Sequence, residues 1–222
     1  MYITFSTINY IRWTENNDWV IASILIRLFA YVFMLLSLNR ESSLKDFILH
    51  PISEGANLLA NWVIVSMVFV LVMAVLLSQY IPVVPKTISQ YHLFGWELNK
   101  WGFTLLAITL FYVSKSLVSY LFYMSINEGD RWTRLVFVST KFYFILSLII
   151  MIINIVHYYF GIDHGIVLRY YWFFAVFVFV FKLFFYGFNK NSILPEDWYY
   201  KILYICTLQI IPIGVLWRLL FL

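Results

Sequence analysis

The sequence has few charged residues. Only 12% of its 222 residues are Asp, Glu, Lys or Arg, whereas roughly a quarter are charged in soluble domains. Hydrophobic residues make up 63% instead, which excludes an ordinary soluble domain and indicates a polytopic membrane protein. Because the apolar runs are continuous rather than alternating, helices are favoured over a membrane barrel. We therefore expect an all-α transmembrane bundle in a single integral membrane domain, residues 1–222.

Cysteine is almost absent as well. The single Cys206 excludes a disulfide framework and CxxC chemistry within the chain, and its apolar surroundings predict a buried small residue. The net charge of +4 is spread over many loops without a basic run. We therefore expect the lipid bilayer as a partner and no nucleic acid.

Hydrophobic segments of about 20 residues, the length that crosses a bilayer, occur six times. The predicted spans are 19–38, 58–81, 101–125, 134–160, 169–186 and 200–222. After the first span, apolar residues recur with helical spacing among charged ones, which predicts a short interfacial helix interrupted by Pro51. Glu15 and Asp18 precede the first span and no cleavage pattern follows it, so a retained helix is favoured over a signal peptide.

Orientation depends on the basic residues of the loops, which divide almost equally between the two sides. The first span is preceded by acidic residues and followed by basic ones. We therefore predict that both termini lie outside, in the periplasm of a bacterium, and that the loops after spans one, three and five lie in the cytoplasm.

Acidic residues are missing from the interior of every predicted span. Proton-driven and sodium-driven carriers usually place carboxylates there, and Pro212 is the only proline deep in a span, so paired helix breaks are absent too. Such transport is disfavoured. Carboxylate pairs, HExxH, GxSxG and Cys/His ligand spacings are also missing. We expect no catalytic residue, cofactor or metal, and we interpret His157, Asp163 and His164 as a capped helix end beside interfacial histidines.

Basic residues, by contrast, do lie within the predicted spans. They are Arg27, Lys115, Lys141 and Lys182. A charge near the bilayer centre costs about 2.5–3.5 kcal/mol on insertion scales, and only Lys141 and Lys182 lie near enough to a helix end to reach the interface. Two interpretations remain open. The four residues make hydrogen bonds to tyrosines and backbone carbonyls, or they form a basic pocket for an anionic headgroup or a phosphate-bearing substrate.

Polar residues form stripes on the fourth and sixth spans. The fourth-span stripe keeps a period near 3.5 and is expected to face protein rather than lipid; it comprises Thr140, Tyr143, Ser147, Asn154 and His157. In the sixth span, helical spacing puts five residues on a single face, with Cys206 and Gln209 on the neighbouring stripe. The five residues are Tyr200, Tyr204, Thr207, Gly214 and Arg218. Pro212 cannot donate to Leu208, which favours either a kinked packed helix or a break that lines a site.

The segment YKILYICTLQIIP resembles the C-terminal signature of a family of small six-helix membrane proteins from Bacteroidota whose function is unknown. The aromatic-rich spans and the helices that carry Lys115 and Lys182 are similar too, so the resemblance covers most of the chain. It places a helix-packing motif on Tyr204, Cys206, Thr207, Leu208 and Pro212. It also implies a bacterial inner membrane, and it predicts an acid where this chain has Gln209.

Two hypotheses about function follow from these features. The first is a non-catalytic scaffold or accessory subunit of a cell-envelope assembly, with a membrane-protein partner, because no catalytic constellation is present and two spans carry polar stripes. The alternative is binding or translocation of an anionic lipid or a polyprenyl phosphate through the intramembrane lysines.

Overall fold

The computed structural model of the chain describes residues 18–34, 36, 58–81, 92–93, 96–97, 100–159, 164–187, 193–195 and 197–221. These ranges are almost entirely helical. The helices are α1 (Asp18–Phe33), α3 (Leu58–Ser78), α5 (Lys100–Ser125), α6 (Gly129–Tyr159) and α7 (His164–Gly187). The last segment consists of α8 (Trp198–Leu203), the π-helix η3 (Tyr204–Ile210) and α9 (Ile211–Phe221). Before α5, β1 (His92–Leu93) and β2 (Trp96–Glu97) pair as a short antiparallel hairpin.

Five helical segments are long and apolar enough to cross a membrane by their length and composition. They are Leu58–Ser78, Lys100–Ser125, Gly129–Tyr159, Val167–Gly187 and Trp198–Leu220. The apolar part of α1, Ile21–Phe33, is shorter. The predicted all-α transmembrane bundle is confirmed, with the fourth helix starting at Gly129 rather than at 134. The interfacial helix predicted after the first span lies outside the described residues.

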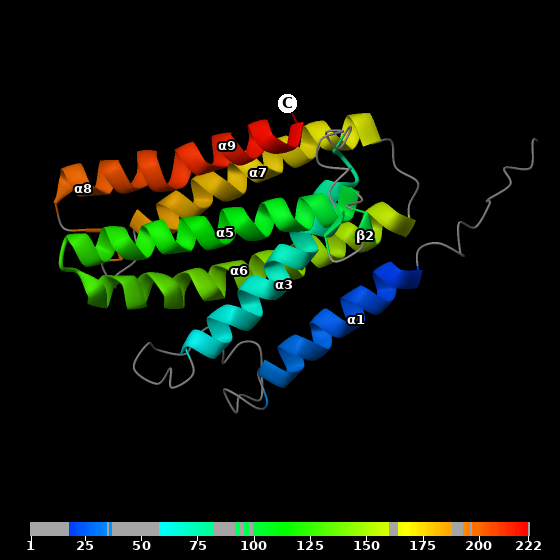
Figure 1. The fold of residues 1–222 in the computed structure, drawn as a ribbon, viewed down its shortest axis with the longest axis horizontal. Helices are drawn as coiled ribbons and strands as arrows, with labels where there is room; N and C mark the ends of the chain where they lie inside the picture. The colour runs from blue at the N-terminus through cyan, green and yellow to red at the C-terminus, as the bar shows by residue number, and fades with distance from the viewer. Residues whose placement is uncertain are drawn as a thin grey trace, which may run out of the picture.

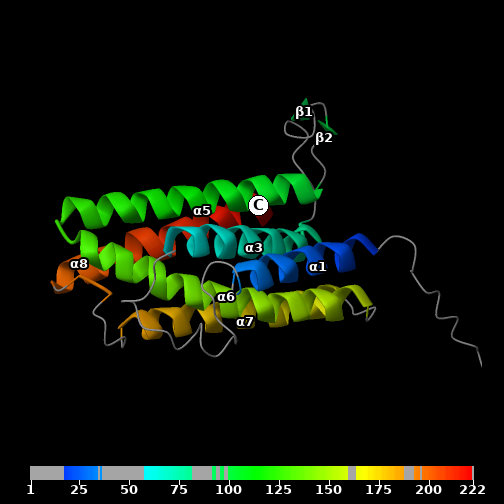
Figure 2. The same cartoon turned by 90° about the horizontal axis from the view of Figure 1, so that it is seen from below.

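The helices run side by side along one axis, and successive helices alternate in direction (Figures 1 and 2). The short hairpin and the start of α1 lie toward one end, here called the hairpin end. The connection from α5 to α6 and helix α8 lie at the other, here called the turn end. Helix α9 runs from the turn end back toward the hairpin end (Figure 1).

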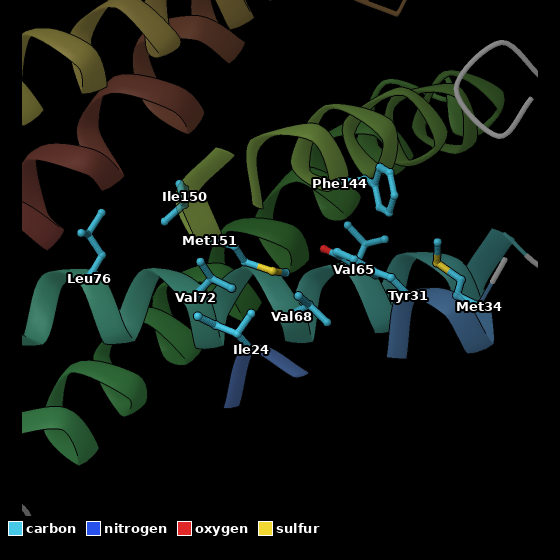
Figure 3. Packing of buried hydrophobic residues seen from close by; sticks show 10 residues of the cluster. All are labelled: Ile24, Tyr31, Met34, Val65, Val68, Val72, Leu76, Phe144, Ile150 and Met151. Carbon is cyan, nitrogen blue, oxygen red and sulfur yellow. The ribbon is translucent and has the colours of Figure 1, made fainter. Parts of the chain in front are cut away.

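Helix α3 lies at the centre of the bundle and packs against α1, α5 and α6. Figure 3 shows its core with α1 and α6, where side chains of all three helices interlock. The cluster comprises Ile24, Tyr31 and Met34 from α1, Val65, Val68, Val72 and Leu76 from α3, and Phe144, Ile150 and Met151 from α6. Because lipid is as apolar as these side chains, close packing rather than the hydrophobic effect stabilises this core.

The polar stripe of α6 faces protein, as predicted. Its members Thr140, Ser147, Asn154 and His157 are buried, and Tyr143 is half-buried. Two of them bind α1 and α3. The Tyr31 hydroxyl lies 2.5 Å from Ser147 Oγ, and Asn154 Nδ2 donates to the carbonyl of Val72 at 3.2 Å. The stripe therefore joins α6 to α1 and α3.

A tight turn joins α5 to α6 and makes them antiparallel neighbours. Asn127 adopts a left-handed conformation with φ of 58°, which Asn tolerates better than most residues. The N–H of Asn127 bonds the carbonyl of Met124 at 3.1 Å, and that of Glu128 bonds Tyr123 at 3.0 Å. These bonds satisfy the last carbonyls of α5.

Candidate functional site

Two of the four predicted basic residues meet between the helices. Lys115 lies on α5 about 15 Å from its end at Ser125, at 1.5 Å per residue. Lys182 lies in the last third of α7 and is 7% exposed. Both side chains line the same cavity. Their ammonium groups therefore share one region of the bundle, at a depth where lipid tails surround the protein.

Neutral groups bind both ammonium groups. Lys115 Nζ donates to Gln209 Oε1 at 2.8 Å, and Gln209 Nε2 donates to the Tyr204 hydroxyl at 2.9 Å. Lys182 Nζ donates to the Tyr143 hydroxyl at 2.8 Å. Lys182 Nζ also lies 4.8 Å and 5.3 Å from the ring centres of Tyr143 and Tyr186, within the range of cation–π attraction. These contacts stabilise the two cations without neutralising them.

A cavity of about 50 Å³, open on one side, lies at this lysine pair. Residues from α3, α5, α6, α7 and η3 line it. They are Trp62, Tyr112, Lys115, Ser116, Ser119, Trp132, Leu135, Val136, Ser139, Tyr143, Lys182, Tyr186, Tyr204 and Gln209. Among these described lining residues there is no Asp or Glu. The cavity thus combines two lysine side chains with hydroxyl and amide groups, and its described lining residues include no acidic partner.

The cavity is closed on one side and open on another. Tyr186, Tyr204 and Gln209 are buried, so the wall formed by α7 and η3 is sealed. Trp62 and Trp132 are partly exposed, but Trp132 packs against a buried cluster at the turn end. The ring of Trp62 lies 6.4 Å from that of Tyr112, which is three residues from Lys115 and farther than it from the turn end. The mouth therefore lies beside Trp62, at the depth of the lysines.

A second cluster closes the bundle beyond the cavity at the turn end. Tyr123 and Ile193 are fully buried there and pack with Tyr204. The Tyr123 hydroxyl donates to the carbonyl of Ile193 at 3.1 Å, and Arg131 Nη1 donates to that of Leu194 at 2.6 Å. These bonds fix the segment before α8 against α5 and α6. They also hold the start of η3 in place.

The π-helix brings Tyr204 and Gln209 into the cavity together. In η3 hydrogen bonds reach back five residues, as from the N–H of Ile211 to the carbonyl of Cys206, so residues five apart align. Tyr204 and Gln209 are five apart, and they are 2% and 1% exposed. The helix returns to α-geometry at Ile211, just before Pro212. The break suspected at Pro212 is thus a change of helix type that lines a cavity.

The face predicted for the last span was wrong. Thr207, Gly214 and Arg218 are exposed, while Leu208 and Gln209 are buried beside Tyr204. The prediction assumed α-helical spacing throughout, and η3 changes the period in the middle of the segment. The stripe that packs inward therefore differs from the predicted one.

The chain matches the family described as Domain of unknown function (DUF4271) over residues 19–220. It belongs to this family. No curated protein and no solved structure matches the chain. Membership confirms the resemblance to a family of unknown function. The Bacteroidota source, the inner membrane and the C-terminal signature stay predictions, and the functional argument rests on the residues.

Within this DUF4271 chain, the predicted packing motif divides between the inside and the outside of the bundle. Tyr204 and Gln209 are buried and Pro212 is half-buried, but Thr207 is exposed. Cys206 is exposed too, so its predicted burial was wrong. The Thr207 hydroxyl bonds the carbonyl of Leu203 in its own helix, which satisfies it on a lipid-facing surface.

The other two basic residues do not line the cavity. Arg27 is 4% exposed and lies on the core face of α1, beside Tyr31. Among the described residues its Nη1 has no hydrogen-bond partner. Lys141 Nζ lies 4.4 Å from the ring centre of Phe137. The predicted four-residue basic pocket is therefore a two-lysine cavity, with Arg27 and Lys141 elsewhere in the bundle.

Sequence reasoning missed several lining residues, although one spacing could have identified them. Ser119 follows Lys115 by four residues, and Tyr186 follows Lys182 by four. Residues four apart lie on the same face of a helix, so each lysine predicts its polar neighbour. By contrast, no spacing within one helix predicts that Lys115 contacts Gln209.

Proposed function

We propose that this protein binds or translocates an anionic lipid, with the headgroup of an anionic phospholipid or a polyprenyl phosphate in the cavity on Lys115 and Lys182. The observation that carries the proposal is a pair of lysines in one cavity whose described lining residues include no acid. Two unbalanced cations at this depth are unfavourable. An anion between them would remove that cost.

The neutral groups around the lysines suit an exchangeable anion. Each ammonium has three donors, and only one bond of each is taken up by the contacts to Gln209 and Tyr143. The remaining donors, with the Ser119 hydroxyl in the lining, can bind further oxygen atoms. Charge-assisted hydrogen bonds of this kind are roughly twice as strong as neutral ones.

Access from the bilayer favours a lipid as the source of the anion. Trp62 is a partly exposed lining residue, and its ring lies 6.4 Å from that of Tyr112, about one helical turn from Lys115. The cavity is therefore accessible at the depth of the lysines, where lipid surrounds the bundle. A lipid can place its headgroup in the cavity while its hydrocarbon chain stays in the membrane, so no apolar surface becomes exposed to water.

Native mass spectrometry of the protein, purified in a mild detergent, tests this proposal. We expect a retained anionic lipid whose occupancy falls strongly in Lys115→Met and in Lys182→Met, since methionine keeps the length and apolar stem of lysine without its charge. Lys141→Met is the matched control, because Lys141 lies outside the cavity lining, and it should retain the lipid. Unchanged lipid occupancy in the first two variants would refute the proposal.

The scaffold hypothesis stays a prediction, but one of the features that favoured it has another explanation. It relied partly on the polar stripe of α6, and that stripe contacts α1 and α3 of the same chain through Ser147 and Asn154. A membrane-protein partner would therefore have to bind another surface. Co-purification of a stoichiometric partner would support this hypothesis, and a clean monomeric preparation would contradict it.

A further inference from the structure

The ligand of this cavity can be specified further if the proposed function holds. We propose that the site selects lipids that end in a phosphate monoester, such as phosphatidic acid or a polyprenyl phosphate, over lipids that carry a phosphate diester. Charge, hydrogen bonding and the shape of the closed wall each support this selection.

Charge is the first argument. The lining carries two lysines and, among its described residues, no acid, so the ligand that balances it has two negative charges. A phosphate monoester carries about −1.5 to −2 at pH 7, whereas a diester carries one negative charge. A bound diester would leave one cation unbalanced in a region of low dielectric, which costs free energy. A zwitterionic headgroup would add a third cation.

Hydrogen bonding is the second argument. A monoester has three terminal oxygens, and a diester has two. Donors face the cavity from two helices: Lys115 and Ser119 on α5, and Lys182 on α7. Three terminal oxygens can accept hydrogen bonds from all three side chains at once. Because an unpaired buried donor costs free energy, the ligand with one oxygen fewer binds more weakly.

The shape of the cavity is the third argument. The wall behind the lysines is sealed by Tyr204 and Gln209, which are 2% and 1% exposed. A lipid enters from the mouth with its headgroup first, so a monoester phosphate is the leading group and ends at the lysines. A diester carries a further substituent beyond its phosphate, and that substituent would meet the sealed wall.

A competition experiment tests the selection in the wild-type protein. Delipidated protein receives equal amounts of dioleoyl phosphatidic acid and dioleoyl phosphatidylglycerol, and native mass spectrometry counts the bound lipid of each kind. We expect phosphatidic acid to be favoured by about tenfold or more, which corresponds to about 1.4 kcal/mol. In Lys115→Met one cation remains, so the preference should fall to nearly equal binding while weak retention persists.

The outcomes separate this inference from the proposed function. Equal retention of both lipids, with a strong fall of both in Lys115→Met and Lys182→Met, would overturn the selection and leave anion binding intact. Lipid retention that stays unchanged in both lysine variants would overturn the proposed function as well. Addition of inorganic phosphate distinguishes a lipid headgroup from free phosphate as the ligand. If millimolar phosphate displaces phosphatidic acid, the site binds the free ion and the lipid assignment is wrong. The wild-type comparison holds even if a lysine variant fails to fold.

Discussion

Gln209 determines whether the charge of the lysine pair is balanced from within the chain. Its Oε1 accepts a hydrogen bond from Lys115 and its Nε2 donates to Tyr204, so the amide fills the position of a counter-ion without carrying charge. The resemblance of the C-terminal segment predicts an acid at this position. A carboxylate there would neutralise Lys115, and the cavity would have less need of an anion.

Replacement of Gln209 by glutamate is therefore expected to preserve the fold and to abolish lipid retention. The carboxylate accepts from Lys115 at the same distance and removes one of the two free charges. Native mass spectrometry should show at least about a tenfold fall in bound anionic lipid, equivalent to about 1.4 kcal/mol. Gln79→Glu is the matched control, because Gln79 donates to Val75 near the hairpin end, outside the cavity lining. Full lipid occupancy in Gln209→Glu would contradict the electrostatic account.

The hydrogen bond between Tyr31 and Ser147 is expected to stabilise the packing of α1 on α6 by a small amount. Ser147 donates its proton to the carbonyl of Phe144 at 2.7 Å, so Tyr31 is the donor in the buried contact at 2.5 Å. Interhelical bonds in membranes contribute about 0.6 kcal/mol on average. A double-mutant cycle with Tyr31→Phe and Ser147→Ala, followed by unfolding in detergent, should give a coupling of that size. Additive effects of the two changes would show that the bond contributes nothing.

At the scale of the elements, straight α-helices were predictable and the last segment was not. The stripe of α6 was predicted because an uninterrupted helix keeps its period from Thr140 to His157. In η3 the period changes without a composition signal, and Pro212 marks only the place where α-geometry returns. Contacts such as Lys115 to Gln209 depend on how two helices are rotated about their axes. One sequence does not contain that information, so it did not predict that Lys115 and Lys182 line one cavity while Arg27 and Lys141 do not.

The turn between α5 and α6 allows the cost of a left-handed backbone conformation to be tested at an exposed residue, where changes in packing are small. Asn127 is exposed and has a φ of 58°, a region that costs ordinary residues about 1–2 kcal/mol. Asn127→Gly should unfold at the same denaturant concentration or a higher one. Asn127→Val should lower the free energy of unfolding by about 1–2 kcal/mol, since β-branched residues avoid this region. Equal stability of the two variants would show that the turn does not hold this conformation.

Considered as a whole, the molecule has a tightly packed half and a loosely packed half. Helix α3 joins α1, α5 and α6 through a continuous apolar core. Among the described side chains of α7, from Val167 on, only Lys182 and Tyr186 are buried, and both line the cavity. Helix α7 thus covers the cavity with Lys182 and Tyr186, and the same two residues contribute polar groups to the cavity. Lipid binding and the docking of α7 should therefore be coupled.

The orientation of the bundle decides which leaflet supplies the ligand, because Lys115 and Lys182 both lie in the half of their helices nearer the turn end. Helix α6 is about 46 Å long at 1.5 Å per residue, longer than the roughly 30 Å hydrocarbon core, so both its ends reach water. With Cys206→Ser as background, Ser125→Cys and Tyr159→Cys report on the turn end and the hairpin end, and both native side chains are exposed. The basic loops predict a cytoplasmic turn end. A membrane-impermeant maleimide should therefore label Tyr159→Cys in intact cells and Ser125→Cys only after permeabilisation. The reverse pattern would contradict this orientation and would make the outer leaflet the source of the anionic lipid.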